Sequence, residues 1–397
     1  MIRQLDKYLH QLERDGAVRH GRVALVARDD LVREAGVADL CTTGRALLSE
    51  VKAIALVIGE PWLPFQNLYP LCLAPESQRI TPLDTETRTF LHDIPLVRRH
   101  HGQIDWTDVA RQLGQRKGVL VEGVGIIAVG SVTVEQGYIN FSTLYHALFV
   151  GYLLHLLQDT PRYAEIEELG PLLEQLDKPI PQQLDDIAVG PFGDEHAALK
   201  AIEQAGRRTV ELHLVDSFFG NISSHVNNQL MISQTGASLD ALVGCVDLVP
   251  DDNTSTAGLT ASSELPAHRA IYEATGASVI LHGHPKFTVI MSLLCEEQGC
   301  HITDCWKDCP QVRYLGTVPV VAGEVGVGGI ARTLAPVMTD GIGVVYGHGV
   351  FAAGKVDFRQ PLQNMIALEN WCRKEYQRLL GQKIAWHEKT GVISESR

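Results

Sequence analysis

The sequence contains no apolar run of the roughly 18–20 residues that a membrane-spanning helix needs. Its first residues, MIRQLDKYLHQLERDG, are charged and lack the apolar core of a secretory signal peptide. Basic runs are also missing, and the 397 residues carry a formal charge of −13. These absences argue against a membrane and against nucleic acid as partners. We therefore expect a cytoplasmic protein, and a small anionic substrate stays open because a local pocket can be positive.

The composition is that of a globular protein, with 45% apolar and 20% charged residues. A chain of 397 residues is long enough for two domains. The stretch 165–199 is acidic and contains four prolines, so it is the best candidate for a boundary. We expect one domain with a linker over residues 1–195 and another over 196–397. In a cytosolic chain, the eight cysteines are expected to be thiols.

An internal repeat links the two halves. Residues 55–72 (ALVIGEPWLPFQNLYPLC) echo 279–295 (VILHGHPKFTVIMSLLC), and 119–130 (VLVEGVGIIAVG) echo 342–354 (IGVVYGHGVFAAG). A similar helical stretch follows the second segment of each half. Two segments that match in order and in approximate spacing indicate a duplicated domain.

The two copies differ at three histidines of the second half. His282, His284 and His348 correspond to Ile58, Glu60 and Val124 in the first half. The first half is also shorter before this region. We interpret it as a shortened, metal-free copy of the second.

Periodicity gives the second half a mixed order of helices and short strands, which suits a layered α/β domain. The predicted helices are 197–217, 266–274 and 362–380, and the predicted strands are 230–232, 277–284, 318–322 and 343–353.

The pair His282-Gly283-His284 lies on a predicted strand. Residues two apart on a strand point to the same face, so both imidazoles project together. Zinc binds imidazole nitrogen at about 2.0–2.1 Å, and three histidines with one open position are typical of a catalytic zinc site. His348, between two glycines, is the third candidate. Taken alone, such a histidine pair is more often metal-free than metal-bound.

Further motifs lie around the histidines, and each also has a purely structural explanation. Ser262-Ser263-Glu264 begins a predicted helix, where it would serve as a helix cap or bind an anion. The stretches 220–223 (GNIS) and 235–238 (TGAS) fit ordinary turns. His268 shares a helix face with Glu264, and packing or a surface position is favoured for it over contact with the site.

Together these motifs make the chain resemble the class II aldolase/adducin family. The order GN-x-S, TG, SSE, H-x-H and HG covers about residues 197–380, and through the repeat it extends weakly over 40–160. The family includes fuculose and rhamnulose phosphate aldolases, a ribulose phosphate 4-epimerase and a methylthioribulose phosphate dehydratase. The resemblance implies a layered α/β/α domain preceded by a shortened degenerate copy.

The resemblance also implies roles for individual residues. It makes His282, His284 and His348 ligands of Zn²⁺ or another divalent metal, and it makes Glu264 the acid/base. It implies that the substrate phosphate is bound by Asn221, Thr235, Gly236, Ser262 and Ser263. A metal that polarises the substrate beside a carboxylate that moves a proton suits retro-aldol cleavage.

The resemblance leaves alternatives open. Dehydration, decarboxylation or epimerisation would use the same residues, and an adducin-like member would be a binding module without catalysis. His225 stands where the family often has a basic residue, so the substrate anion could differ from phosphate. Tyr314 has only a loose match to a family tyrosine. Family members form rings of four with active sites between subunits, so we expect a homo-oligomer, with a dimer of duplicated chains as one form of that ring.

Two other patterns compete with this interpretation. Residues 326–331 (GVGGIA) fit a dinucleotide fingerprint, but no acidic residue follows at the required distance, so a tight turn is favoured. The four cysteines Cys295, Cys300, Cys305 and Cys309 lie within one loop. They could bind a second zinc or an iron–sulfur cluster, although partly buried free thiols are favoured.

Overall fold

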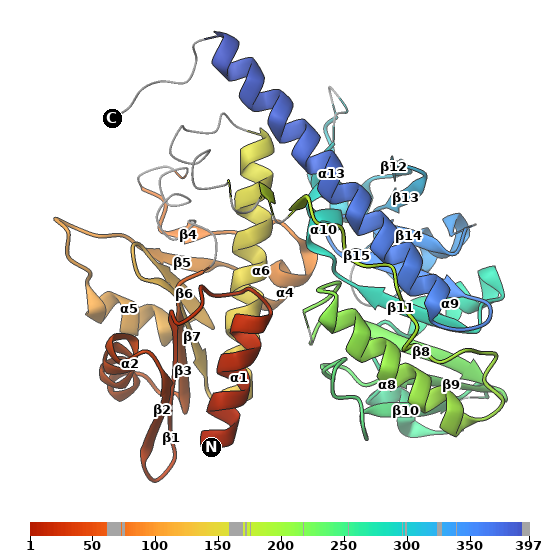
Figure 1. The fold of residues 1–397 in the computed structure, drawn as a ribbon, viewed down its shortest axis with the longest axis horizontal. Helices are drawn as coiled ribbons and strands as arrows, with labels where there is room; N and C mark the ends of the chain where they lie inside the picture. Colours follow the sequence, from red (N-terminus) through yellow and green to blue (C-terminus); the bar gives the residue numbers. More distant parts are fainter. Residues whose placement is uncertain are drawn as a thin grey trace. The chain divides into compact units, whose positions relative to one another are not determined.

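The computed structural model divides the chain into two compact units (Figure 1). The first consists of Met1–Glu174 with Lys383–Arg397, and the second of Gln175–Gln382. The structure describes all residues except 62–72, 74, 75, 159–169, 171, 172, 175, 217, 253, 296, 298, 299, 324–327, 339 and 391–397, and it leaves out the side chains of 386–390.

The first unit is built on one mixed sheet with the strand order β2-β1-β3-β7-β6-β5-β4. Its strands are β1 (Val23–Arg28), β2 (Val32–Gly36), β3 (Ala55–Gly59), β4 (Arg79–Ile80), β5 (Ile94–Val97), β6 (Gly118–Val121) and β7 (Gly125–Gly130). Its helices are α1 (Ile2–Arg14), α2 (Ala38–Glu50), α4 (Thr85–Leu91), α5 (Trp106–Leu113) and α6 (Val134–Gln158).

The second unit is built on a sheet with the order β10-β9-β8-β11-β15-β14-β13-β12. Its strands are β8 (Asn221–Val226), β9 (Gln229–Ser233), β10 (Val246–Pro250), β11 (Val279–Gly283), β12 (Arg313–Leu315), β13 (Val318–Val321), β14 (Ile342–Val345) and β15 (Gly349–Gly354). Its helical elements are α8 (Glu195–Glu211), η2 (Thr256–Leu259), α9 (Leu265–Thr275), α10 (Lys286–Leu293), α11 (Cys305–Asp308), α12 (Gly329–Thr333), η3 (Ala335–Val337) and α13 (Arg359–Thr390).

The two sheets share their topology, which confirms the predicted second copy. The order of neighbouring strands is the same in the two sheets. It runs β1-β3-β7-β6-β5-β4 in the first unit and β8-β11-β15-β14-β13-β12 in the second. In both sheets one pair along this path is parallel, β5 with β6 and β13 with β14, and the pairs around it are antiparallel. The repeat detected in the sequence is therefore a repeat of the fold.

Helices cover both faces of the second sheet, giving the predicted α/β/α layers (Figure 1). Helices α9 and α12 pack on the face that carries Ile280 and Phe351, in one apolar core. On the other face, a Cβ added at Gly283 would lie 2.7 Å from the Leu214 backbone oxygen, just beyond α8, and 3.3 Å from the Met365 sulfur of α13. Gly283 therefore lets α8 and α13 pack closely behind the two histidines that flank it.

The predicted strand over residues 343–353 is two strands. β14 and β15 form an antiparallel hairpin, in which Val345 pairs with Gly349, and residues 346–348 make the turn. Gly347 adopts a left-handed conformation with φ 57°, which favours glycine. His348 therefore lies in a turn and not on a strand as the pattern predicted. The other predicted elements of this half are present, most with ends displaced by one to three residues, but α8 ends at Glu211 and not at 217, and α13 continues to Thr390 and not 380.

Hydrogen bonds hold the segment before α8 against the rest of the second unit. The Asn370 side chain of α13 accepts from the Ile180 N–H at 2.8 Å and donates to the Ile180 carbonyl at 3.0 Å. The Asp357 carboxylate accepts from the Gly190 N–H at 3.0 Å. These contacts explain why the compact unit begins at Gln175, well before α8.

A buried carboxylate caps α10, the helix that begins directly after His284. Glu369 of α13 accepts from the N–H groups of Phe287 and Thr288 at 3.1 and 2.8 Å, and from the Thr288 hydroxyl. Burial raises the pKa of Glu369. We expect Glu369→Ala to cost about 2–3 kcal/mol of unfolding free energy, because it leaves buried donors without an acceptor.

Denaturant unfolding measures this effect, and Glu375→Ala is the matched control on the same helix. Glu375 forms a surface pair with Arg378, so the control is expected to cost less than about 1 kcal/mol. Equal destabilisation by the two substitutions would contradict the capping role.

Within the part of the chain that the structure describes, no helix has the length and apolar character needed to cross a membrane.

Candidate metal centre

Three histidines converge in the second unit. His282 is the fourth residue of β11, His284 follows that strand, and His348 lies in the turn between β14 and β15. One nitrogen of each lies within 4.8 Å of the others. All three are buried, with at most 4% of their surface exposed. The structure thus brings together the residues that the sequence indicated as metal ligands.

Strand pairing explains the convergence. β11 lies between β8 and β15, so that His282 pairs with Asn221 on one side and with Phe351 on the other. A Cβ added at Gly349 would lie 2.7 Å from the His284 ring and 3.1 Å from the His282 ring. The glycine that follows His348 is thus required for the three imidazoles to fit side by side.

The proton positions favour a cation between the histidines. His282 Nδ1 lies 2.9 Å from the Val350 carbonyl oxygen, which can only accept, so Nδ1 carries the hydrogen. Burial lowers the pKa of His282 to about 4, which makes it neutral and leaves a lone pair on Nε2.

The Nε2 lone pair of His282 faces other atoms that can act as metal ligands. His284 Nε2 lies 2.8 Å from His282 Nε2, and a Glu264 oxygen lies 3.3 Å away. A single proton can bridge only one of these two contacts by a hydrogen bond. A divalent cation can bind the nitrogen and oxygen atoms together. The residues therefore fit a zinc ion.

Glu264 completes the cluster from the N-terminus of α9. One carboxylate oxygen accepts from His348 Nε2 at 2.8 Å, and the other accepts from the Asn221 side-chain amide at 2.7 Å. Burial opposes its ionisation, but the adjacent His282 and His348 and the amide of Asn221 lower the pKa of Glu264 overall. The structure therefore holds an ionised carboxylate against the histidines.

A chain of buried hydrogen bonds orients Glu264. The amide of Asn221 donates to Glu264, so its oxygen accepts from His268 Nε2 at 2.5 Å. His268 is fully buried, and burial lowers its pKa to about 3, so the neutral ring accepts at Nδ1. There the Ser223 hydroxyl donates at 2.7 Å and itself accepts from the Tyr272 hydroxyl at 2.8 Å.

The sequence favoured packing or a surface position for His268, whereas the structure places it within this series of buried hydrogen bonds. Ser223 and Tyr272 were not predicted to contact the site. One signal was available, because Glu264, His268 and Tyr272 recur at spacings of four on one helix. The contribution of β8 depends on its pairing with β11, which the sequence does not reveal.

The His268 ring gives a testable prediction. Because the ring holds Asn221, which in turn orients the carboxylate, we expect His268→Leu to lower kcat by about 10–100-fold with bound metal unchanged. The control is His196→Leu, since His196 is exposed at the start of α8 and is not part of the histidine cluster. Kinetic constants together with the pH profile of each variant check this, and an unchanged kcat for His268→Leu would refute the orienting role.

Four of the five residues predicted to bind the substrate anion, all except Asn221, lie in two adjacent segments. Gln234 bridges to Ala261, and Thr235 donates from its N–H to the Thr260 carbonyl at 3.1 Å and from its hydroxyl to the Ala261 carbonyl at 2.9 Å. Ser262 is buried, and its hydroxyl accepts from the Glu264 N–H at 3.3 Å.

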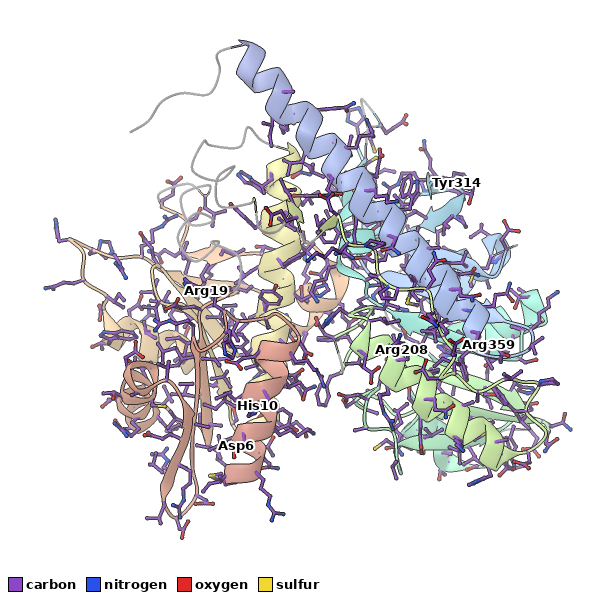
Figure 2. The ribbon with its side chains drawn as sticks, in the orientation of Figure 1. Asp6, His10, Arg19, Arg208, Tyr314 and Arg359 are labelled. Atoms are coloured by element: carbon purple, nitrogen blue, oxygen red, sulfur yellow. The ribbon has the colours of Figure 1, made fainter. Side chains whose placement is uncertain are left out.

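Four further residues named in the sequence analysis complete this picture. Gly236, with φ 72°, and Ser263 are exposed. Asn221, predicted to bind the phosphate, lies between Glu264 and His268, and its anion-binding role stays a prediction. Tyr314, on the edge strand β12, is 63% exposed (Figure 2).

The equivalent place in the first unit is apolar. Ile58 pairs with Ala24 and Ile127 as His282 pairs with Asn221 and Phe351. Ile58 is fully buried in an apolar core, with Val124 packed against it. Val124 lies in a turn with the same hydrogen bond to the third preceding residue as His348. The register thus confirms both predicted correspondences.

Two more positions complete the contrast. Val37 precedes α2 as Glu264 precedes α9, and it packs against the same apolar core. Glu60, which corresponds to His284, forms ion pairs with Arg22 and Arg19. Among the residues that the structure describes, the metal-ligand cluster is present in the second unit alone.

The fold and the site together define a layered α/β domain with a buried three-histidine, one-glutamate centre. Residues 200–376 match the model of the Class II Aldolase and Adducin N-terminal domain. The second unit is thus a class II aldolase/adducin domain, as the sequence motifs indicated.

Solved structures similar to the chain include an L-fuculose-1-phosphate aldolase from Thermus thermophilus. It is 23% identical, with a TM-score of 0.37, over 48% of this chain and 96% of that one. YgbL of Escherichia coli, a putative aldolase/epimerase/decarboxylase, is 20% identical, with a TM-score of 0.37, over 44% and 86%. A sugar-phosphate aldolase from Thermotoga maritima is 16% identical, with a TM-score of 0.36, over 47% and 96%. No curated protein matches the chain.

Proposed function

We propose that the second unit is a zinc-dependent lyase that cleaves a phosphorylated or otherwise anionic sugar-like ketone by a retro-aldol reaction. The observation that carries the proposal is the contact of one buried carboxylate, Glu264, with two of three convergent histidines. A structural role alone would not require a buried acid beside three histidines, because burying an ionised carboxylate is costly.

Retro-aldol cleavage needs a base and a means of stabilising negative charge. The base removes a proton from the substrate hydroxyl, the carbon–carbon bond breaks, and its electron pair passes to the carbon beside the carbonyl. A zinc ion bound by His282, His284 and His348 would supply the Lewis acid that stabilises the resulting charge on oxygen. Glu264 would accept the proton and return it to the carbanion carbon.

The chain's own residues prepare Glu264 for this work. Asn221 fixes one carboxylate oxygen and leaves the second facing His348. The low pKa of Glu264 keeps it deprotonated before the reaction. Thr235, Gly236, Ser262 and Ser263 would bind the anionic end of the substrate, because the two segments that carry them are joined by hydrogen bonds beside the start of α9.

The first unit would take no part in the chemistry, because Ile58 and Val124 are apolar and Glu60 is paired with arginines. We further propose that the chain is a homo-oligomer in which the inert unit replaces a neighbouring subunit. Sedimentation analysis tests the assembly, and a monomer at working concentration would refute it.

A screen of sugar phosphates tests the function. We expect the zinc-loaded chain to release an aldehyde from at least one ketose phosphate, and treatment with a chelator to abolish release until zinc is restored. Release of an enone, carbon dioxide or an epimer in place of an aldehyde would replace retro-aldol cleavage by another reaction of this family. A chain that turns over no substrate in the zinc-loaded state would contradict the enzymatic proposal.

A further inference from the structure

A second cluster of metal-ligand side chains lies away from the three histidines. Cys295, Cys300, Cys305 and Cys309 line one cavity of about 60 Å³ in the second unit. All four are free thiols. Four cysteines from one 15-residue stretch thus surround a common space without forming disulfides.

Hydrogen bonds fix both sides of this cavity. Arg313, another lining residue, donates to the carbonyl oxygens of Ser292 and Leu294 at 3.0 and 2.5 Å. The carbonyl of Trp306, next to Cys305, accepts from the Gly323 N–H at 2.9 Å. The cysteine segment is therefore held at defined points and is not merely a surface loop rich in thiols.

The four thiols line one cavity, but as they stand they are not placed to hold a single ion. Among the described residues, the group of side chains placed to hold a metal ion is the three histidines. A tetrahedral zinc with bonds of about 2.3 Å would hold its sulfur ligands about 3.8 Å apart. A polynuclear centre with sulfide between the metals takes four thiolates around a larger core.

We propose that Cys295, Cys300, Cys305 and Cys309 bind an iron–sulfur cluster. Four thiolates are the usual ligands of such clusters. The run ends Cys305-x₃-Cys309-Pro310, which matches the end of the C-x₂-C-x₂-C-x₃-C-P run of bacterial ferredoxins, although the earlier spacings are longer.

The charges around the cavity agree with a bound cluster. The Arg313 guanidinium offsets part of the negative charge that thiolates and sulfides bring, while Glu297 is the acidic residue that lines the cavity.

The cluster is independent of the proposed lyase activity. Among the described residues that line the cysteine cavity, none belongs to the histidine centre of His282, His284, His348 and Glu264. The link between the two sites is structural, since Ser292, whose carbonyl binds Arg313, accepts through its hydroxyl from the Gly347 N–H at 2.9 Å. The histidine centre can therefore fail a test without affecting the cluster.

Metal and sulfide analysis of the full chain tests the proposal. The chain is purified without oxygen, and then reconstituted with ferrous iron and sulfide. We expect iron and acid-labile sulfide in a one-to-one ratio, with the broad visible absorption of sulfide-to-iron charge transfer. The iron and sulfide contents of Cys305→Ser and Cys309→Ser are expected to be at least about tenfold lower than those of the wild-type chain. His348→Ala is expected to keep the wild-type contents.

Cys245→Ser is the matched control, because Cys245 is a free thiol outside the cavity. It is expected to keep the full iron and sulfide content. The proposal is overturned if the wild-type chain takes up no iron and sulfide, if it binds a single zinc at the cysteines, or if the cysteine variants keep their iron. Should the variants be insoluble, Mössbauer spectra of the wild-type chain decide, since iron with oxygen or nitrogen ligands also overturns it.

Discussion

Replacing Glu264 with glutamine is expected to lower turnover by roughly 10²–10⁴-fold, the range associated with loss of a general acid/base. Glutamine has nearly the same shape, and its carbonyl oxygen can still accept from the Asn221 amide. It cannot take a proton from the substrate. Bound metal is expected to stay at the wild-type level, because the three imidazole ligands remain. Steady-state kinetics and metal analysis of the same preparation provide the measurement.

The control is Glu273→Gln on the same helix. Glu273 is exposed and lies on the far side of α9 from the cluster residues Glu264 and His268, so its loss should leave kcat unchanged. If Glu264→Gln retained the wild-type kcat, another group would have to be the acid/base, although the histidine centre would stand.

Replacing His282 with alanine is expected to have the second large effect, a loss of metal affinity of more than about 100-fold. Removing a residue that only orients a ligand costs about 10–100-fold, and His282 is proposed to be a ligand itself. It also occupies the centre of the cluster, with contacts to both His284 and Glu264. Competition with a metal-binding dye measures the affinity, and activity should fall with it.

His196→Ala is the matched histidine substitution, because His196 is exposed at the start of α8. It should leave metal affinity unchanged. A His282→Ala chain that binds zinc as tightly as the wild type would place the metal elsewhere.

The convergence of the histidines was predictable because its signal is local. His282 and His284 are two residues apart, and a strand of β-branched residues requires them to share a face. The family resemblance then implied His348 as the third member, and the repeat aligned it with Val124. The conformation of His348 was not predictable in this way, because the apolar residues of β14 and β15 form one continuous pattern across the turn. Only the strand pairing shows that the chain reverses at Gly347.

The surroundings of Glu264 depend on contacts between distant segments. Asn221 reaches Glu264 because β8 pairs with β11, and no spacing in the sequence specifies this register. For the same reason Ser223 and His268 were not recognised as partners. A buried histidine in the first turns of an amphipathic helix looks, from the sequence, like any residue of the core.

The inert copy was the more predictable of the two units. Once the repeat was aligned, Ile58 and Val124 could not bind metal, and the structure shows what replaces the centre. The polar cluster has become part of an apolar core, and Glu60 has become the partner of arginines. Glu60 could not be assigned this partner from the repeat, because Arg22 lies in the loop before β1.

The central claim is that His282, His284 and His348 form a metal centre in the second unit and that the first unit is an inert copy of the same fold. Anomalous X-ray diffraction at the zinc edge, from crystals of the zinc-loaded chain, tests it most directly. The account predicts a strong peak bounded by the side chains of His282, His284 and His348, with none beside Ile58 and Val124. A crystal of zinc-loaded protein with no peak at the histidines, or with an equal peak in the first unit, would contradict it.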